Sequence, residues 1–301
     1  MSEEARRFLS QSLALTDPYP ALDDTEGWLR FVEQHNERVR ARSESPDLPV
    51  SVEDTVRGGA RTFVIRPEGV PEGEGPILLD IHGGALVFGG GDLCARNGST
   101  MAMTAGTETW SVDYRMPPLH PYPAALDDCL AAYRALLEVR DPADIFVSGL
   151  SAGGNLASAL LVRARDEGLP MPAALVLLTP EVDLTESGDS FRTNDGIDNV
   201  LAGLREVNLL YANGHDLAHP YLSPLFADLT GFPPVFLQAG TRDLFLSNTV
   251  RMHRALLAAG AEAELHVFEA MPHAGFGGAA PEDAELAAAI RGFLDRHRRS
   301  S

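Results

Sequence analysis

One serine lies at the junction between a strand-like run and a helix-like run. Residues 145–148 form an apolar run with β-branched members, residues 149–153 read Gly-Leu-Ser-Ala-Gly, and a helix-forming stretch covers residues 156–165. The small residues on both sides of Ser151 allow the backbone to turn sharply and to present the hydroxyl outside the chain. The pattern therefore predicts a strand–turn–helix unit whose serine is placed as a nucleophile.

Apolar strands and amphipathic helices alternate along most of the chain. Short, continuous apolar runs are typical of strands buried on both faces, which occur in parallel sheets covered by helices. Strands are predicted at residues 50–56, 61–66, 77–81, 109–112, 145–148, 174–178, 235–238 and 264–268, and helices at residues 124–137, 156–165 and 284–298. The first two strands flank Gly58-Gly59 and indicate a hairpin. We expect an α/β fold with a mostly parallel central sheet and helices on both faces.

Two segments depart from this alternation. Residues 1–45 read as amphipathic helices, and a polar, proline-containing connector follows over residues 43–49. The interval 185–220 is rich in Asp, Asn, Gly and His and does not read as one crossover helix. Open α/β sheets bind ligands at the carboxyl ends of their strands. We therefore predict a core of residues 46–184 and 221–301, with residues 1–45 and 185–220 forming a small helical cap over that edge.

The charge of the chain excludes several functions. The formal net charge is −19 at pH 7, so the phosphates of a nucleic acid would be repelled. All 24 basic residues are arginine. Without lysine there is no Schiff-base or pyridoxal phosphate linkage, no P-loop lysine and no Ser–Lys hydrolase pair. A nicotinamide-dependent oxidoreductase is also disfavoured, because no Gly-x-Gly-x-x-Gly motif opens the first strand–helix unit.

The sequence carries no signal for a membrane or for secretion. No apolar run approaches the length of a transmembrane helix, and the first residues, Met-Ser-Glu-Glu-Ala-Arg-Arg, lack the apolar region of a signal peptide. Cys94 and Cys129 are too few for a disulfide framework and are interpreted as buried thiols. We expect a cytoplasmic protein without a membrane partner.

Three chemistry-bearing residues occur in an informative order. Ser151 is followed by Asp243, which comes after a buried strand, and by His273, which lies in a loop of small residues after the last strand. Acyl transfer needs a nucleophile, a base and a carboxylate that orients the base, and Ser, Asp, His is an order in which such triads occur. Asp183 also follows a predicted strand and is the alternative acid. Its neighbour Glu181 is a candidate for lining the site.

A glycine-rich loop follows the strand at residues 77–81. Glycine lets backbone amides approach a substrate and point at developing negative charge. We predict an oxyanion hole formed by the amides of Gly83, Gly84 and Ala152. His82 is interpreted as a support that holds this loop by hydrogen bonds. No cysteine or paired-histidine spacing indicates a metal site. The apolar residues predicted to line a substrate pocket are Leu86, Val87, Phe88, Leu150, Phe245 and Phe276.

From residue 77 onward the chain resembles the bacterial hormone-sensitive-lipase-like carboxylesterases of the α/β-hydrolase fold. The matching motifs are His82-Gly83-Gly84, Asp113-Tyr114-Arg115, His120-Pro121-Tyr122-Pro123-Ala124-Ala125, Ser151-Ala152-Gly153-Gly154-Asn155, Asp243 and Pro272-His273. The resemblance implies that fold, a cap built from an amino-terminal segment and an insertion after the sixth strand, and no cofactor. It also leaves open a homodimer. Ala85 replaces the family's third loop glycine and Leu150 replaces its usual Asp or Thr, so the substrate preference is not carried over.

Residues and resemblance together predict a serine carboxylesterase acting through an acyl-enzyme on uncharged, short- to medium-chain esters. Ser151 would attack the carbonyl, His273 would take and return the proton, and Asp243 would orient the ring. A lactone hydrolase with the same triad is an alternative, because the two activities differ in pocket shape alone. A non-catalytic ligand receptor on the same scaffold is more distant, since it would require a missing triad member. The expected partner is a small-molecule ester or lactone.

Overall fold

The computed structural model describes residues 1–15, 17–42 and 48–299. The strands are β1 (Val50–Arg57), β2 (Ala60–Pro67), β3 (Ile77–Ile81), β4 (Glu108–Val112), β5 (Ile145–Leu150), β6 (Ala174–Leu178), β7 (Val235–Gly240) and β8 (Ala263–Phe268). The helices are α1 (Glu3–Leu9), α2 (Thr25–Arg42), α3 (Asp92–Ala105), α4 (Ala124–Leu137), α5 (Ala152–Asp166), α6 (Ser190–Thr193), α7 (Arg205–Ala212), α8 (Leu246–Ala258) and α9 (Pro281–Arg296), with 3-10 turns η1 (Pro142–Asp144) and η2 (Pro224–Phe226). Among the helices described, none combines the length and the apolar character that crossing a bilayer demands.

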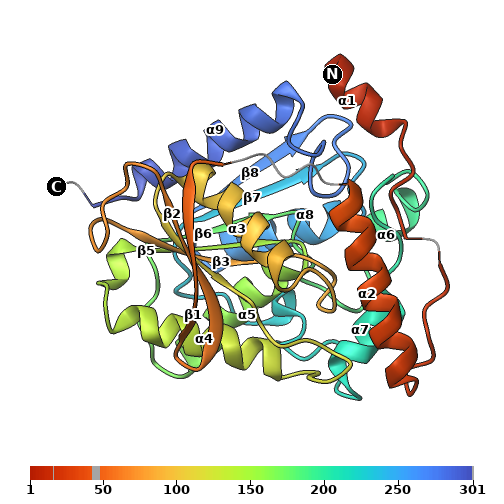
Figure 1. Ribbon diagram of the computed structural model, residues 1–301, viewed down its shortest axis with the longest axis horizontal. Helices are drawn as coiled ribbons and strands as arrows, with labels where there is room; N and C mark the ends of the chain where they lie inside the picture. The colour runs from red at the N-terminus through yellow and green to blue at the C-terminus, as the bar shows by residue number, and fades with distance from the viewer. Residues whose placement is uncertain (16, 43–47, 300–301) are drawn as a thin grey trace.

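The strands form one twisted sheet in the order β1-β2-β4-β3-β5-β6-β7-β8 (Figure 1). β1 and β2 are an antiparallel hairpin, and β2 also runs antiparallel to β4. From β4 to β8 every neighbouring pair is parallel. The carboxyl ends of β3, β5, β6 and β7 therefore lie at one edge of the sheet, and the loops that follow them meet there. The structure confirms the predicted α/β fold with a mostly parallel sheet.

Helices cover both faces of the sheet because its central strands are apolar on both faces. Side chains alternate between the two faces along a strand. Leu78, Phe146 and Phe236 pack with residues of α3 and α9. Their sequence neighbours Leu79 and Val147 pack on the opposite face, in the main core with α4, α5 and α8. Figure 1 shows α9 along one side of the sheet and α4 along the other.

The predicted positions of the strands agree with the structure, whereas the amino-terminal segment is less helical than predicted. β3, β6 and α4 have the predicted bounds, and the ends of the other strands differ by one or two residues. Among the described residues of the segment 1–45, α1 and α2 are helical and the residues between them are not. Pro18 and Pro20 interrupt any helix there, because proline lacks an amide donor and restricts the preceding residue. Most of the connector predicted for residues 43–49, and the domain boundary at residue 45, lie outside the described residues.

The amino-terminal segment lies against the insertion, defined here as residues 185–220. The amides of Leu13 and Ala14 donate to the Asn199 carbonyl at 2.8 and 2.9 Å. Trp28 on α2 is fully buried in an apolar cluster that includes Val207 on α7. Figure 1 shows α2 beside α7. The two segments thus pack together as a shared cap would require, and their function as a cap stays a prediction.

One carboxyl group is buried in the middle of the sheet. Asp80 in β3 is 5% exposed and accepts hydrogen bonds from Ser148 Oγ at 2.7 Å and from Ser111 Oγ at 3.2 Å. Burial raises the pKa of Asp80 to about 6, and the two hydroxyl donors offset part of that rise. This carboxyl therefore takes up a proton more readily in the folded than in the unfolded chain.

We expect the free energy of unfolding of Asp80→Asn, relative to that of the wild type, to increase as the pH rises. The folded pKa of Asp80, about 6, exceeds its ordinary value of 3.8, so the wild-type protein loses stability as the pH rises from the lower value through the higher one. A difference of about two pH units corresponds to about 3 kcal/mol, and an asparagine does not titrate. Urea unfolding of both proteins at about pH 4.5 and about pH 8 measures the effect. A stability difference that is the same at both pH values would contradict the prediction.

Candidate active site

The predicted nucleophile sits on a turn that only small neighbours allow. Ser151 separates β5 from α5 with φ 57° and ψ −121°, and residues other than glycine rarely adopt a positive φ. A Cβ on Gly149 would lie 2.2 Å from the Gly153 carbonyl oxygen. A Cβ on Gly153 would lie 1.9 Å from the Ile81 carbonyl oxygen. Both positions therefore require glycine, and the turn holds Ser151 beside the end of β3.

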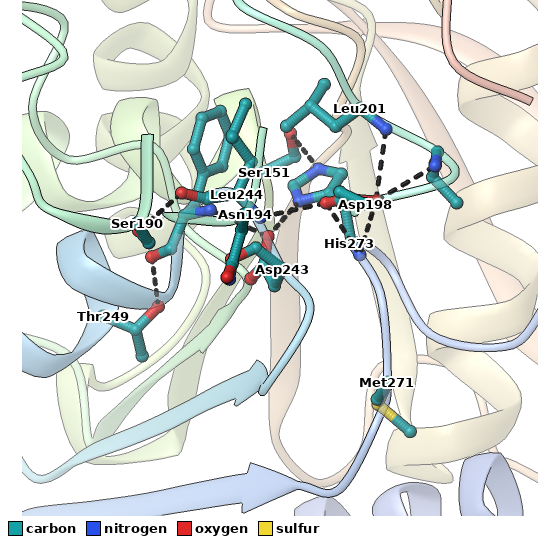
Figure 2. Close-up of polar contacts among 12 residues, drawn as sticks. Ser151, Ser190, Asn194, Asp198, Leu201, Asp243, Leu244, Thr249, Met271 and His273 are labelled. Atoms are coloured by element: carbon teal, nitrogen blue, oxygen red, sulfur yellow. Dashed lines mark hydrogen bonds and ion pairs between the residues drawn. The ribbon is translucent and has the colours of Figure 1, made fainter. Parts of the chain in front are cut away.

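The three residues predicted as a triad are brought together by loops at the carboxyl ends of β5, β7 and β8. The Ser151 hydroxyl lies 2.8 Å from His273 Nε2, and His273 Nδ1 lies 2.9 Å from Asp243 Oδ1 (Figure 2). An ionised carboxylate only accepts hydrogen bonds, so Nδ1–H donates to Asp243 and Nε2 accepts from the Ser151 hydroxyl. Ser151 and His273 are each 5% exposed, and Asp243 is fully buried. In this geometry the imidazole can take the proton of the hydroxyl.

Asp243, and not the alternative Asp183, is the carboxylate that contacts His273. Asp243 Oδ1 also accepts from the Phe245 amide at 2.9 Å, which fixes the carboxylate on its loop. Asp183 accepts hydrogen bonds from Ser187 Oγ and from the Arg251 guanidinium, both at 2.6 Å. Burial acts to raise the pKa of Asp183, but these hydrogen bonds outweigh it and the pKa is lowered. Asp183 is therefore engaged in a separate ion pair.

The pKa of His273 is raised although the ring is buried. Burial acts to lower this pKa, because a low-dielectric surrounding disfavours the charged ring. The charge of Asp243 and its hydrogen bond to Nδ1 act in the opposite direction, and Asp198 adds to them. The net result is a pKa above the ordinary histidine value, because an imidazolium at this position is stabilised by two carboxylates.

The loop after β3 brings backbone amides to the serine. A Cβ on Gly83 would lie 3.3 Å from Ser151 Cβ. Gly84 has φ 125°, and a Cβ there would lie 2.2 Å from the Phe88 carbonyl oxygen. Within the described chain, the amides of Gly83, Gly84 and Ala152 donate to no protein acceptor. Donors of this kind next to a nucleophile are suited to bind an oxyanion.

His82 supports this loop. Its Nδ1 donates to the Gly83 carbonyl at 2.7 Å, and its ring stacks on Tyr114 with the centroids 4.1 Å apart. The Tyr114 hydroxyl donates to the His82 carbonyl at 2.9 Å. Burial lowers the pKa of His82, although its hydrogen bond to Gly83 opposes that effect, so the ring is neutral. Ala85, at the position of the family's third glycine, adopts φ 50°, and the loop keeps a left-handed turn there at some cost in strain.

Three of the six predicted pocket residues lie in one apolar cluster at the triad, called here the triad-side cluster. Its buried members are Trp28, Ala85, Val87, Phe88, Leu204, Val207, Leu244 and Phe245. The Phe245 ring lies edge-on to the His273 ring, with centroids 5.0 Å apart. The cluster joins Phe245 and the loop after β3 to α2 and α7, and so to both predicted cap segments.

The other three predicted pocket residues pack elsewhere. Leu86 belongs to the main core with α4 and α5, and its φ is 65°. Phe276 packs with Ala5 of α1. Leu150 lies against the cluster formed by α3 and α9. The pocket role of these three residues stays a prediction.

A second carboxylate beside the triad was not predicted from the sequence. Asp198 in the insertion is 3% exposed, and its Oδ2 accepts from the amides of Leu244 at 2.9 Å and His273 at 3.3 Å. One oxygen of Asp198, one oxygen of Asp243 and a ring nitrogen of His273 all lie within 4.8 Å of one another. The sequence signal for Asp198 is its four-residue spacing from Asn194. This spacing can be interpreted only when the packing of the insertion is known.

The Glu181 backbone contacts Ser151, the predicted nucleophile. Its amide donates to the Ser151 carbonyl at 3.1 Å, and its side chain is fully buried. Glu181 Oε1 accepts from Asn208 Nδ2 on α7 at 2.9 Å. Burial raises the pKa of Glu181 to about 8, and the hydrogen bond from Asn208 offsets part of that rise. The carboxyl is thus protonated near neutral pH.

Two groups of described side chains have the composition of metal ligands. One is Asp198, Asp243 and His273, and the other is His82, Cys94 and Asp113. The first group is engaged in the hydrogen bonds of the triad. In the second group, Asp113 pairs with Arg61 at 2.8 Å and Cys94 Sγ lies 3.4 Å from Ser111 Oγ. Protein partners account for most of these atoms, and the absence of a metal stays a prediction.

Comparison with known proteins identifies the family. A family described as the α/β hydrolase fold matches residues 78–276. An acetyl-hydrolase of Streptomyces hygroscopicus is 36% identical over 203 residues, 66% of this chain and 68% of the relative. The crystal structure of the esterase E25 has a TM-score of 0.89 and 37% identity, covering 99% of this chain and 95% of that one. The crystal structure of an esterase from the bacterial hormone-sensitive lipase family has a TM-score of 0.85 and 31% identity over 99% of both chains. The chain therefore belongs to the α/β-hydrolase fold family, among the bacterial hormone-sensitive-lipase-like esterases.

Proposed function

We propose that this protein is a serine carboxylesterase that hydrolyses uncharged, short- to medium-chain esters through an acyl-enzyme. The observation that carries the proposal is the pair of hydrogen bonds, 2.8 and 2.9 Å long, that links Ser151 through His273 to Asp243. Membership of an esterase family supports the same reaction class, and the relatives are themselves named esterase and acetyl-hydrolase.

The proposed reaction begins when Ser151 Oγ attacks the ester carbonyl carbon while its proton passes to His273 Nε2. Asp243 keeps Nδ1 protonated and stabilises the imidazolium that forms. The carbonyl oxygen, now negative, accepts hydrogen bonds from the free amides of the loop after β3 and of Ala152. The imidazolium then protonates the leaving alcohol oxygen as the bond from that oxygen to the carbonyl carbon breaks. Water repeats the two steps on the acyl-enzyme and releases the acid.

The surroundings of the triad support an uncharged substrate. The apolar ring of Phe245, a member of the triad-side cluster, lies against the His273 ring. The net charge of −19 disfavours anionic esters through long-range repulsion. The buried carboxyl of Glu181, protonated near neutral pH, adds no negative charge beside Ser151.

We expect Ser151→Ala to lower kcat for p-nitrophenyl butyrate by about 10⁴-fold or more, because no other group can form the acyl-enzyme. Steady-state hydrolysis measures the loss, and a fluorophosphonate probe should label the wild-type protein but not the variant. Ser158→Ala is the matched control, since Ser158 lies on the same helix and donates to the Gly154 carbonyl. Undiminished turnover in Ser151→Ala would refute the nucleophile.

The pH dependence of kcat/KM should show an acid limb above the ordinary histidine pKa of 6.5. His273 must be neutral to accept the Ser151 proton, and its pKa is raised by Asp243 and Asp198 against the effect of burial. Activity is therefore expected to rise as the pH climbs through that raised value. A pH–rate profile in buffers of constant ionic strength tests this, and a rate that is flat from acid to alkaline pH is incompatible with a histidine base.

Two matched carboxamide variants distinguish the candidate acids. We expect Asp243→Asn to lower kcat by about 10³- to 10⁴-fold, because an amide at that position no longer holds His273 in the productive tautomer. Asp183→Asn should instead weaken the ion pair with Arg251 and lower the melting temperature, while kcat stays within a few-fold of the wild type. Steady-state kinetics and thermal unfolding of the two variants measure both effects. The opposite ranking of kcat would assign the acid to Asp183.

A further inference from the structure

The insertion docks three polar side chains against the loops of the triad. Ser190, Asn194 and Asp198 follow one another at intervals of four residues, and Figure 2 shows them converging on the Asp243 loop and on His273. Ser190 Oγ donates to the Leu244 carbonyl at 2.7 Å. Asn194 Nδ2 donates to the Asp243 carbonyl at 2.8 Å. These two neutral side chains hold two consecutive backbone carbonyls, those of Asp243 and Leu244.

Asp198 differs from them because it brings a charge and reaches a second loop. Its carboxylate accepts from four backbone amides, those of Val200 at 3.0 Å, Leu201 at 3.3 Å, Leu244 at 2.9 Å and His273 at 3.3 Å. The first two belong to its own turn, and the other two belong to the loops after β7 and β8. One buried side chain therefore ties the insertion to both loops that carry the base and its acid.

The charged groups around the imidazole are few. The charged groups that raise the pKa of His273 are Asp243, from the loop after β7, and Asp198, from the insertion. Those that act on Asp198 are His273 and Asp243. The remaining groups described against the His273 ring are neutral: the Ser151 hydroxyl after β5 and the Phe245 ring. A change of charge at Asp198 should therefore change the pKa of His273 directly.

We propose that Asp198 is a positioning residue of the triad: it holds the His273 backbone and the Asp243 loop in place and sets a second carboxylate beside the imidazole. This inference rests on the proposed esterase function and deepens it. A consequence is that the triad has its full geometry only while the insertion is docked, because Asp198, Asn194 and Ser190 all come from that segment.

Asp198→Asn tests the charge, because asparagine keeps the size of the side chain and one acceptor oxygen. With p-nitrophenyl butyrate we expect kcat/KM to fall about 10- to 100-fold, as a misplaced base would cause. We also expect the acid limb of the kcat/KM profile to move to lower pH by about one pH unit. The sign follows because a nearby carboxylate stabilises the imidazolium, so its removal lets the ring lose its proton at lower pH. A merely structural role would reduce the rate without moving the limb.

Three variants control the experiment. Asp183→Asn removes another buried carboxylate, one that faces Arg251, and should leave the acid limb at its wild-type position. Asp198→Glu restores the charge and should return the limb toward the wild type. Asp198→Ser, which is smaller and uncharged, gives the same readout as Asp198→Asn if the asparagine does not fold. Circular dichroism and fluorophosphonate labelling of Ser151 verify that each variant is folded.

An Asp198→Asn enzyme whose acid limb coincides with that of the wild type overturns the proposal, whatever its rate. The same holds if Asp183→Asn moves the limb as far. Failure of the proposed function looks different: the wild-type protein then does not hydrolyse the ester, or Ser151→Ala hydrolyses it equally well.

Discussion

Two glycines allow close contact between two backbone segments, and this contact holds the site together. A Cβ on Gly83 would lie 2.9 Å from the Leu150 carbonyl oxygen, and a Cβ on Gly153 would lie 1.9 Å from the Ile81 carbonyl oxygen. The loop after β3 and the turn after β5 can approach this closely only because both positions lack a side chain. The strained φ of Ser151 persists because β3, β5 and α5 enforce it from several sides. The free amides and the Ser151 hydroxyl therefore keep one relative position.

The parts of the site that depend on such local contacts were predictable from the sequence. The turn at Ser151 and the loop after His82 are encoded by small residues next to apolar strands, so composition and order were enough to find them. β3 and β6 have the predicted bounds because their apolar runs begin and end abruptly. Asp243 and His273 were predicted from chain order and from the resemblance, and the structure places both within hydrogen-bond distance of one another.

The missed parts depend on tertiary packing that local sequence does not encode. Asp198 looks like one of several acidic residues in a polar segment, and its contact with the His273 amide exists only because the insertion folds back over the loop after β7. Leu86 and Phe276 were assigned to the pocket from their apolar character. That character is the same whether a side chain faces a substrate or the core, and Leu86 packs with residues of the main core.

The arrangement of charges at His273 explains why a second buried carboxylate can be tolerated there. Burial raises the pKa of Asp198, and the charge of His273 together with the amide donors offsets part of that rise. Two buried carboxylates this close to one another repel each other when both are ionised and the imidazole is neutral. In the proposed reaction His273 accepts the Ser151 proton, and the imidazolium then attracts both carboxylates. In the proposed reaction, the negative charges of the two carboxylates are thus better compensated after the proton has moved than before. An interaction that is stronger in the transition state than in the ground state accelerates a reaction.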